Sequence, residues 1–124
     1  MSVIMAPKPS LRILIVDDEP SVCMSLQMLF GLSGHSTEIA ASGKEALALF
    51  HPDKFDLVLT DWFMPEMTGG QLAEIIRQRA PSIPIVLMSA CPPQTTPEAV
   101  DWVLLKPFSI ESLQNALDRA TKRP

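Results

Sequence analysis

Three aspartates end or follow apolar segments of the chain, at positions where their carboxylates would meet. Asp17 and Asp18 follow the apolar run 12–16, and Asp61 ends a second run at 57–61. In a parallel α/β sheet, ligands bind at the carboxyl ends of the strands, so these side chains would share one pocket. Like charges so close repel, and burying them without partners is costly. A hard divalent cation with oxygen ligands, Mg²⁺ or Mn²⁺, would offset that repulsion.

Two further polar residues end apolar segments and would lie at the same edge. Ser89 follows the run 84–88, and Lys106 follows the run 102–105. An acid after a strand is also explained by capping of the next helix or by the helix dipole. It is the combination of three carboxylates, one hydroxyl and one cation that indicates a chemical site.

Alternation of strand and helix patterns must position these residues. The expected strands are 12–16, 36–40, 57–61, 84–88 and 102–105, and the expected helices are 20–32, 43–50, 69–79 and 109–121. Residues Ile13–Val16 and Ile85–Met88 are wholly apolar, which is typical of parallel strands covered on both faces. In the first helix we expect Met24 and Met28 to fill the core.

Five motifs together make the chain resemble the receiver domains of two-component response regulators. They are Val-Asp-Asp-Glu-Pro at 16–20, Leu-Thr-Asp-Trp-Phe-Met-Pro at 59–65, Thr68-Gly69-Gly70, Met88-Ser89-Ala90 and Lys106-Pro107-Phe108. The resemblance runs from about Leu11 to the C-terminus. It implies an α/β fold with a doubly wound, five-stranded parallel sheet, flavodoxin-like, in the order 2-1-3-4-5. We expect residues 1–9 to form a flexible tail and residues 10–124 to form the receiver domain.

The resemblance also implies a function and a role for each residue of the pocket. Asp61 would accept a phosphoryl group from a sensor histidine kinase or a phosphotransfer protein. The implied Mg²⁺ ligands are Asp18, Asp61 and the backbone carbonyl of Phe63, with Asp17 acting through water. Lys106 would supply positive charge to the phosphoryl group, and Ser89 would hydrogen-bond it and start a conformational change. The Lys106–Pro107 bond is expected to be cis.

The chain departs from the family pattern in its output region. The position three residues before Lys106 usually holds an aromatic switch residue, and here it is Val103. Prolines 92, 93 and 97 forbid a continuous helix across 90–101. We therefore expect the fourth helix of the family to be shortened or replaced by an irregular loop with little packing of its own.

Two alternative functions remain open on the sequence. A degenerate receiver would act as a protein-binding module without phosphorylation. An enzyme on a similar sheet is the other, but the acidic motif at 17–20 would repel a flavin phosphate, and the Asp-x-Asp pattern of haloacid-dehalogenase-like phosphatases is absent. We expect no turnover of an external substrate.

Composition limits the partners. The 124 residues suit one domain, and the formal net charge of −4 with no basic block argues against direct binding of nucleic acid. No apolar run reaches the length of a membrane span, and the first residues lack the pattern of a signal peptide. We expect a cytoplasmic protein whose downstream partner is another, unidentified protein.

Overall fold

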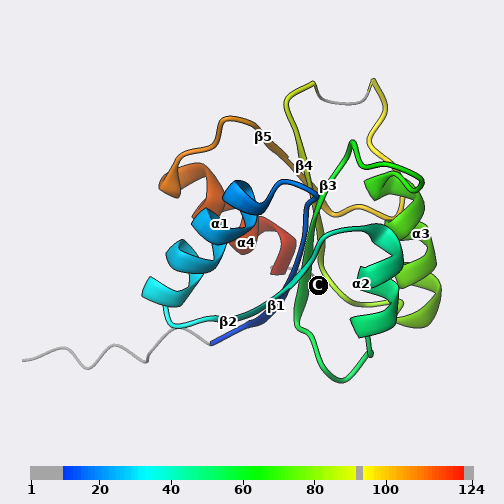
Figure 1. Ribbon diagram of the computed structural model, residues 1–124, viewed down its shortest axis with the longest axis horizontal. Coiled ribbons are helices and arrows are strands. Elements are labelled where there is room, and N and C mark those ends of the chain that lie inside the picture. The colour runs from blue at the N-terminus through cyan, green and yellow to red at the C-terminus, as the bar shows by residue number, and fades with distance from the viewer. Residues whose placement is uncertain (1–9, 92–93, 122–124) are drawn as a thin grey trace, which may run out of the picture.

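A parallel five-stranded sheet with helices on both faces forms the fold, as the computed structural model shows (Figure 1). The strand order is β2-β1-β3-β4-β5, which confirms the expected flavodoxin-like topology. The structure describes residues 10–91 and 94–121, so the expected tail at 1–9 lies outside the described residues. Within the described part, no helix is long and apolar enough to cross a membrane.

The elements fall close to their expected positions. They are β1 Arg12–Val16, α1 Pro20–Leu32, β2 Ser36–Ala40, α2 Gly43–Leu49, β3 Leu57–Asp61, α3 Gly69–Arg79, β4 Ile85–Ser89, β5 Trp102–Leu105 and α4 Ile110–Thr121. The last helix begins one residue later than predicted because Ser109 caps it, its hydroxyl accepting the N–H of Ser112 at 3.0 Å. Helix α2 ends one residue early because the backbone of Phe50 is extended.

Both faces of the sheet are buried, which explains the apolar strands. Every residue of β3 and β4 is buried. One core lies between the sheet and helices α2 and α3, and includes Leu72 and Ile76. The other lies beneath α1 and α4 and includes Phe30 and Leu117. Rigid packing on both sides fixes the carboxyl ends of the strands, where the polar residues stand.

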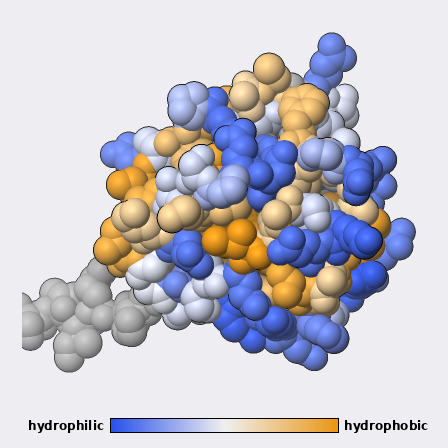
Figure 2. Space-filling view, viewed as in Figure 1, coloured by the Kyte–Doolittle hydropathy of each residue, from blue (hydrophilic) through white to orange (hydrophobic). Residues whose placement is uncertain are grey.

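The expectation that Met24 and Met28 fill the core is wrong. Their exposed fractions are 66% and 65%, because the core face of α1 is formed by Cys23, Leu26 and Phe30. Hydrophobic residues accordingly reach the surface on the side of the molecule where α1 lies (Figure 2). Helix α1 has no charged residue, so only the exposed polar residues Ser21, Ser25 and Gln27 mark the outer face on which the two methionines lie.

The connection between β4 and β5 confirms one expectation and corrects another. Its described residues, 90–91 and 94–101, form bends and a turn without a helix. The Val100 N–H donates to the Pro97 carbonyl at 3.0 Å in that turn. However, Ala99 and Val100 are buried in the core beside α2 and α3. The prediction of little packing is therefore wrong for the second half of this connection.

A guanidinium group holds that second half in place. Arg77, on α3, donates to the carbonyl oxygens of Pro81, Ile83 and Ala99 and to the carboxylate of Asp101, at 2.6 to 3.0 Å. The same carboxylate oxygen of Asp101 accepts the N–H of Ile85 at 2.8 Å. Hydrogen bonds from one arginine therefore join α3, the start of β4 and the end of the connection.

We expect Arg77→Ala to lower the free energy of unfolding by about 2 kcal/mol, because hydrogen bonds to charged groups are lost and a partly buried carboxylate loses its cation. Denaturant unfolding measures this. Arg79→Ala is the matched control, since Arg79 makes one long contact to the Leu47 carbonyl at 3.4 Å. Its effect should stay within about 0.5 kcal/mol. Equal losses in the two variants would contradict this role of Arg77.

Candidate functional site

The carboxyl edge of the sheet brings the three predicted aspartates together. Asp17, Asp18 and Asp61 each offer a carboxylate oxygen, and these oxygens lie within 4.8 Å of one another. Asp17 is only 1% exposed and Asp61 only 8%, whereas Asp18 is open to solvent. Two of the three aspartates are therefore buried, and the third is exposed.

Strand register explains how the predicted residues reach one edge. Asp61 pairs with Met88 across β3 and β4, and Ser89 pairs with Leu105 across β4 and β5. Lys106 follows Leu105 directly, and its N–H donates to the Ser89 carbonyl at 2.9 Å. Each polar residue thus lies at the end of its strand, as the sequence predicts.

Asp17 is fixed by the backbone around it. Its N–H donates to the Ala40 carbonyl at 3.1 Å, which extends the pairing of β1 with β2 by one residue. Its carboxylate accepts the N–H of Glu19 at 2.9 Å, at the point where α1 begins. The side chain is therefore held before any ligand arrives.

Lys106 joins the two buried carboxylates. Its Nζ atom lies 3.0 Å from Oδ1 of Asp61 and 3.2 Å from Oδ2 of Asp17. The expected cis bond between Lys106 and Pro107 is present. One ammonium group therefore faces the cluster from the β5 side.

The charges in the cluster do not balance. Burial, and then the charge of Asp17, raise the pKa of Asp61, although Lys106 opposes both. Burial alone would lower the pKa of Lys106. The interactions with Asp61 and Asp17 outweigh burial, so the pKa is raised. One cation against three carboxylates leaves an excess of negative charge. An all-oxygen donor set of this kind fits a hard divalent cation such as Mg²⁺.

Ser89 lies at the same edge but is bonded to its own loop. Its hydroxyl donates to the Cys91 carbonyl at 2.5 Å and accepts the Cys91 N–H at 3.2 Å. The side chain is almost completely buried, with 1% exposed. The hydroxyl must give up the bond to Cys91 before it can donate to a ligand bound at Asp61.

Phe63 lies two residues after Asp61 and is exposed to solvent. Its ring is 65% exposed and lies edge-on to the ring of Trp62, with centroids 6.2 Å apart. The role of its backbone carbonyl as a metal ligand stays a prediction.

Gly69 is required beside the site for a steric reason that was not predicted from the sequence. Its N–H donates to the Trp62 carbonyl at 2.9 Å, and a Cβ atom at this position would collide with the backbone carbonyl of Asp61. Only glycine allows α3 to begin so close to the site. The Gly-Gly pair at the start of a predicted helix was the available signal.

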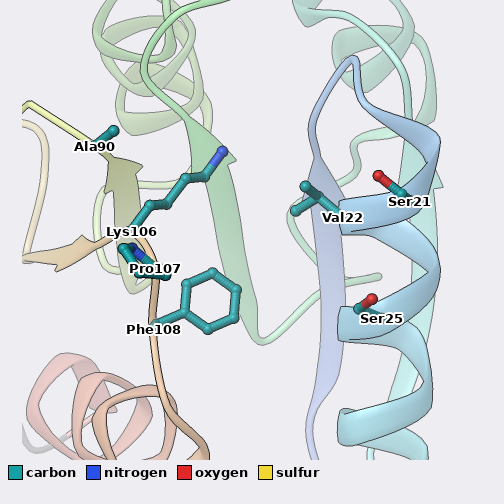
Figure 3. A pocket seen from close by; sticks show the side chains of 7 residues that line it. All are labelled: Ser21, Val22, Ser25, Ala90, Lys106, Pro107 and Phe108. Carbon is teal, nitrogen blue, oxygen red and sulfur yellow. The ribbon is translucent and has the colours of Figure 1, made fainter.

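A hollow of about 460 Å³ lies between Lys106 and helix α1. It is lined by Ser21, Val22 and Ser25 of α1, and by Ala90, Lys106, Pro107 and Phe108. Figure 3 shows the ring of Phe108 pointing across the hollow toward α1. The apolar part of the lysine side chain is thus accessible beside the charged cluster.

Comparison with known proteins agrees with this geometry. A family model described as the response regulator receiver domain matches residues 13–118. The regulatory protein AtoC of Escherichia coli is 39% identical over 115 residues, which cover 88% of this chain and 25% of AtoC. The chain therefore spans about a quarter of the length of such curated relatives.

Two solved structures share the fold over most of their length. The chemotaxis protein CheY4 of Vibrio cholerae has a TM-score of 0.82 and 28% identity, covering 90% of this chain and 99% of CheY4. The response regulator TrrA of Thermotoga maritima, solved in complex with Mg²⁺-BeF, has a TM-score of 0.80 and 30% identity, covering 88% of this chain and 97% of TrrA. On this evidence, the chain belongs to the receiver domain family of the response regulators of two-component systems.

Proposed function

We propose that this domain, residues 10–124, receives a phosphoryl group on Asp61 from a phosphohistidine of a sensor histidine kinase or a phosphotransfer protein. The observation that carries the proposal is the pairing of Asp61 with Lys106 at 3.0 Å inside the acidic cluster. A carboxylate oxygen placed beside a fixed cation suits an acceptor of a phosphoryl group, since such transfer depends chiefly on positioning and charge neutralisation.

The transfer conserves atoms and charge in a simple way. A carboxylate oxygen of Asp61 forms the new bond to phosphorus, and the bond from phosphorus to the donor imidazole nitrogen breaks. The electron pair of that bond stays on the imidazole nitrogen. Lys106 lies within reach of Asp61 and would meet the negative oxygens of the incoming group.

We infer that Asp18, Asp61 and the backbone carbonyl of Phe63 hold Mg²⁺ or Mn²⁺, with Asp17 acting through water. The ion, when bound, neutralises negative charge on the phosphoryl oxygens. Three carboxylate oxygens within 4.8 Å of one another support this inference, and so does the Mg²⁺-BeF complex of the related TrrA. Asp17 is the most buried of the three and already pairs with Lys106, which suits an indirect role.

The signal would leave the site through Ser89. Transfer of its hydroxyl from the Cys91 carbonyl to the phosphoryl group would release the loop after β4. We propose that another protein reads this change, that this domain itself does not contact nucleic acid, and that it works in the cytoplasm beside its kinase. A receiver serves as a signalling module rather than as an enzyme that turns over substrates, and the proposal extends that to this chain.

A binding module without phosphorylation is the second candidate. The altered connection between β4 and β5 favours it, because that segment departs most from the family pattern. Labelling with a small acyl phosphate distinguishes the phosphorylated receiver from the binding module.

Asp61 is expected to be the phosphorylated residue. Incubation with a small acyl phosphate and Mg²⁺ should add one phosphoryl group per chain by intact mass, and Asp61→Ala should lose this labelling. Asp53→Ala, an exposed aspartate in a turn, is the matched control and should label like the unchanged protein. Labelling of Asp61→Ala at the original rate would reject the assignment, and no labelling of the unchanged chain would favour the binding module.

Trp62 is expected to report metal binding, because it directly follows Asp61. Titration with Mg²⁺ should change tryptophan emission, and Asp18→Ala should weaken that response. Trp62→Phe removes the reporter. Trp102, at the start of β5 with its ring beneath the guanidinium of Arg119, contributes a constant background emission. A response that persists unchanged in Trp62→Phe would show that the reporter is another residue.

Phe63 is expected to slow loss of the phosphoryl group, because an apolar ring at the rim hinders an attacking water molecule. Phe63→Asn should dephosphorylate up to about tenfold faster, equivalent to about 1.4 kcal/mol in the barrier. The ring is exposed, so the fold should tolerate the change. Phe63→Leu keeps an apolar side chain and should stay near the original rate. Equal or slower loss in Phe63→Asn would refute the shielding role.

A further inference from the structure

We propose that Trp62 is a positioning residue that couples the state of Asp61 to the connection between β4 and β5, through the space beside Gly70 that its indole shares with Pro97. The inference rests on the proposed phosphorylation of Asp61. It assigns to Trp62 the task that an aromatic residue at position 103 performs elsewhere in the family.

The backbone of Trp62 is held on both sides of the peptide chain. Its N–H donates to the Met88 carbonyl on β4 at 2.9 Å, and its carbonyl accepts the N–H of Gly69 at the start of α3, also at 2.9 Å. These bonds tie the backbone of Trp62 to β4 and α3, and its peptide bond joins it to Asp61. A shift of the Asp61 backbone passes directly to the indole ring.

The indole ring occupies the space that a side chain at position 70 would need. A Cβ atom placed on Gly70 would lie 2.6 Å from Cζ3 of Trp62, 3.2 Å from Cη2 and 3.7 Å from Cγ of Pro97. The edge of the indole and the ring of Pro97 thus border the same small space above α3. In Figure 1 the connection passes the start of α3 on its way to β5, in agreement with the closeness of Pro97 to Gly70.

Beyond Pro97 the connection is anchored. Ala99 and Val100 are buried in the core, and Arg77 bonds both the Ala99 carbonyl and the Asp101 carboxylate. The Val100 N–H closes the turn onto the Pro97 carbonyl at 3.0 Å. Pro97 therefore lies between the anchored end and the indole, so a displaced indole would shift residues 94–96.

Val103 does not provide another path. It is half-buried and packs against the core beside α2 and α3, and it has neither an aromatic ring nor a polar tip. Trp62 packs against that same core cluster, which contains Ala99 and Val100 as well. An aromatic side chain that packs against the core of the connection is thus present, but directly after β3 rather than on β5.

Amide hydrogen exchange across 94–101 tests the coupling, with Mg²⁺ alone and with Mg²⁺ and beryllofluoride as the phosphoryl mimic. The readout is the ratio of exchange rates between the two states, which we expect to be about 5-fold or more in the unchanged chain. Trp62→Leu removes the indole and should reduce the ratio to about 1. A purely structural role would shift both states equally and leave the ratio intact.

Gly70→Ala gives a second variant in which the indole is displaced and not removed. It should also reduce the ratio to less than about half of its original value. Gly31→Ala is the matched control, because it adds the same methyl group within a helix at a position with nothing within 4 Å. Trp102→Phe controls for the loss of an indole. Both controls should keep the original ratio.

The outcomes separate this inference from the proposed function. Intact mass with an acyl phosphate measures labelling of every variant in parallel. Variants that still accept the phosphoryl group but show a reduced ratio of exchange rates support the coupling through Trp62. A labelled Trp62→Leu that keeps the full ratio overturns the coupling and leaves the phosphorylation of Asp61 standing. An unchanged chain that neither labels nor responds to beryllofluoride overturns both.

Discussion

The pairing of one ammonium group with two buried carboxylates is the interaction on which the rest of the site depends. Lys106 lies at the end of β5, and Asp17 and Asp61 come from β1 and β3. Three separate strands must therefore stay in register for the charges to remain paired. Without the lysine, two buried carboxylates would face each other at great electrostatic cost. The apolar packing on both faces of the sheet holds those strand ends in place, so the core and the site depend on each other.

The loops at this edge of the sheet are held by hydrogen bonds in two different ways. In the loops after β1 and β3, the Glu19 N–H donates to the Asp17 carboxylate and the Trp62 N–H donates to the Met88 carbonyl, each at 2.9 Å. The connection after β4 begins with a serine bonded to its own loop and ends in a segment held by Arg77. Local hydrogen bonds can exchange partners at small net cost, whereas the anchored end is tied to several groups at once. Exchange of the Ser89 hydroxyl bond is thus a smaller change than release of the end that Arg77 holds.

Most of the fold and the composition of the site followed from the sequence, for physical reasons. Apolar runs in parallel strands are long and uninterrupted, and Asp17, Asp61, Ser89 and Lys106 each stand at the end of such a run. The exposure of Met24 and Met28 was harder to predict, because α1 has no charged residue and only the uncharged Ser21, Ser25 and Gln27 mark its outer face. Burial of Ala99 and Val100 could not be predicted. It depends on Arg77, more than twenty residues earlier in the chain, and local patterns carry no information about such a contact.

Two glycines at the start of α3 have a cost in folding. Gly69 makes room for the carbonyl of Asp61, and Gly70 makes room for the indole of Trp62. Each lowers helix stability relative to alanine, by less than about 1 kcal/mol at the start of a helix, because an unfolded glycine has more conformations to lose. The capping box between Thr68 and Gln71, in which each side chain bonds the other residue's N–H, offsets part of that loss. The first turn of α3 is thus a place where the chain accepts a weaker helix in exchange for close approach, and where a stabilising substitution would disturb the site.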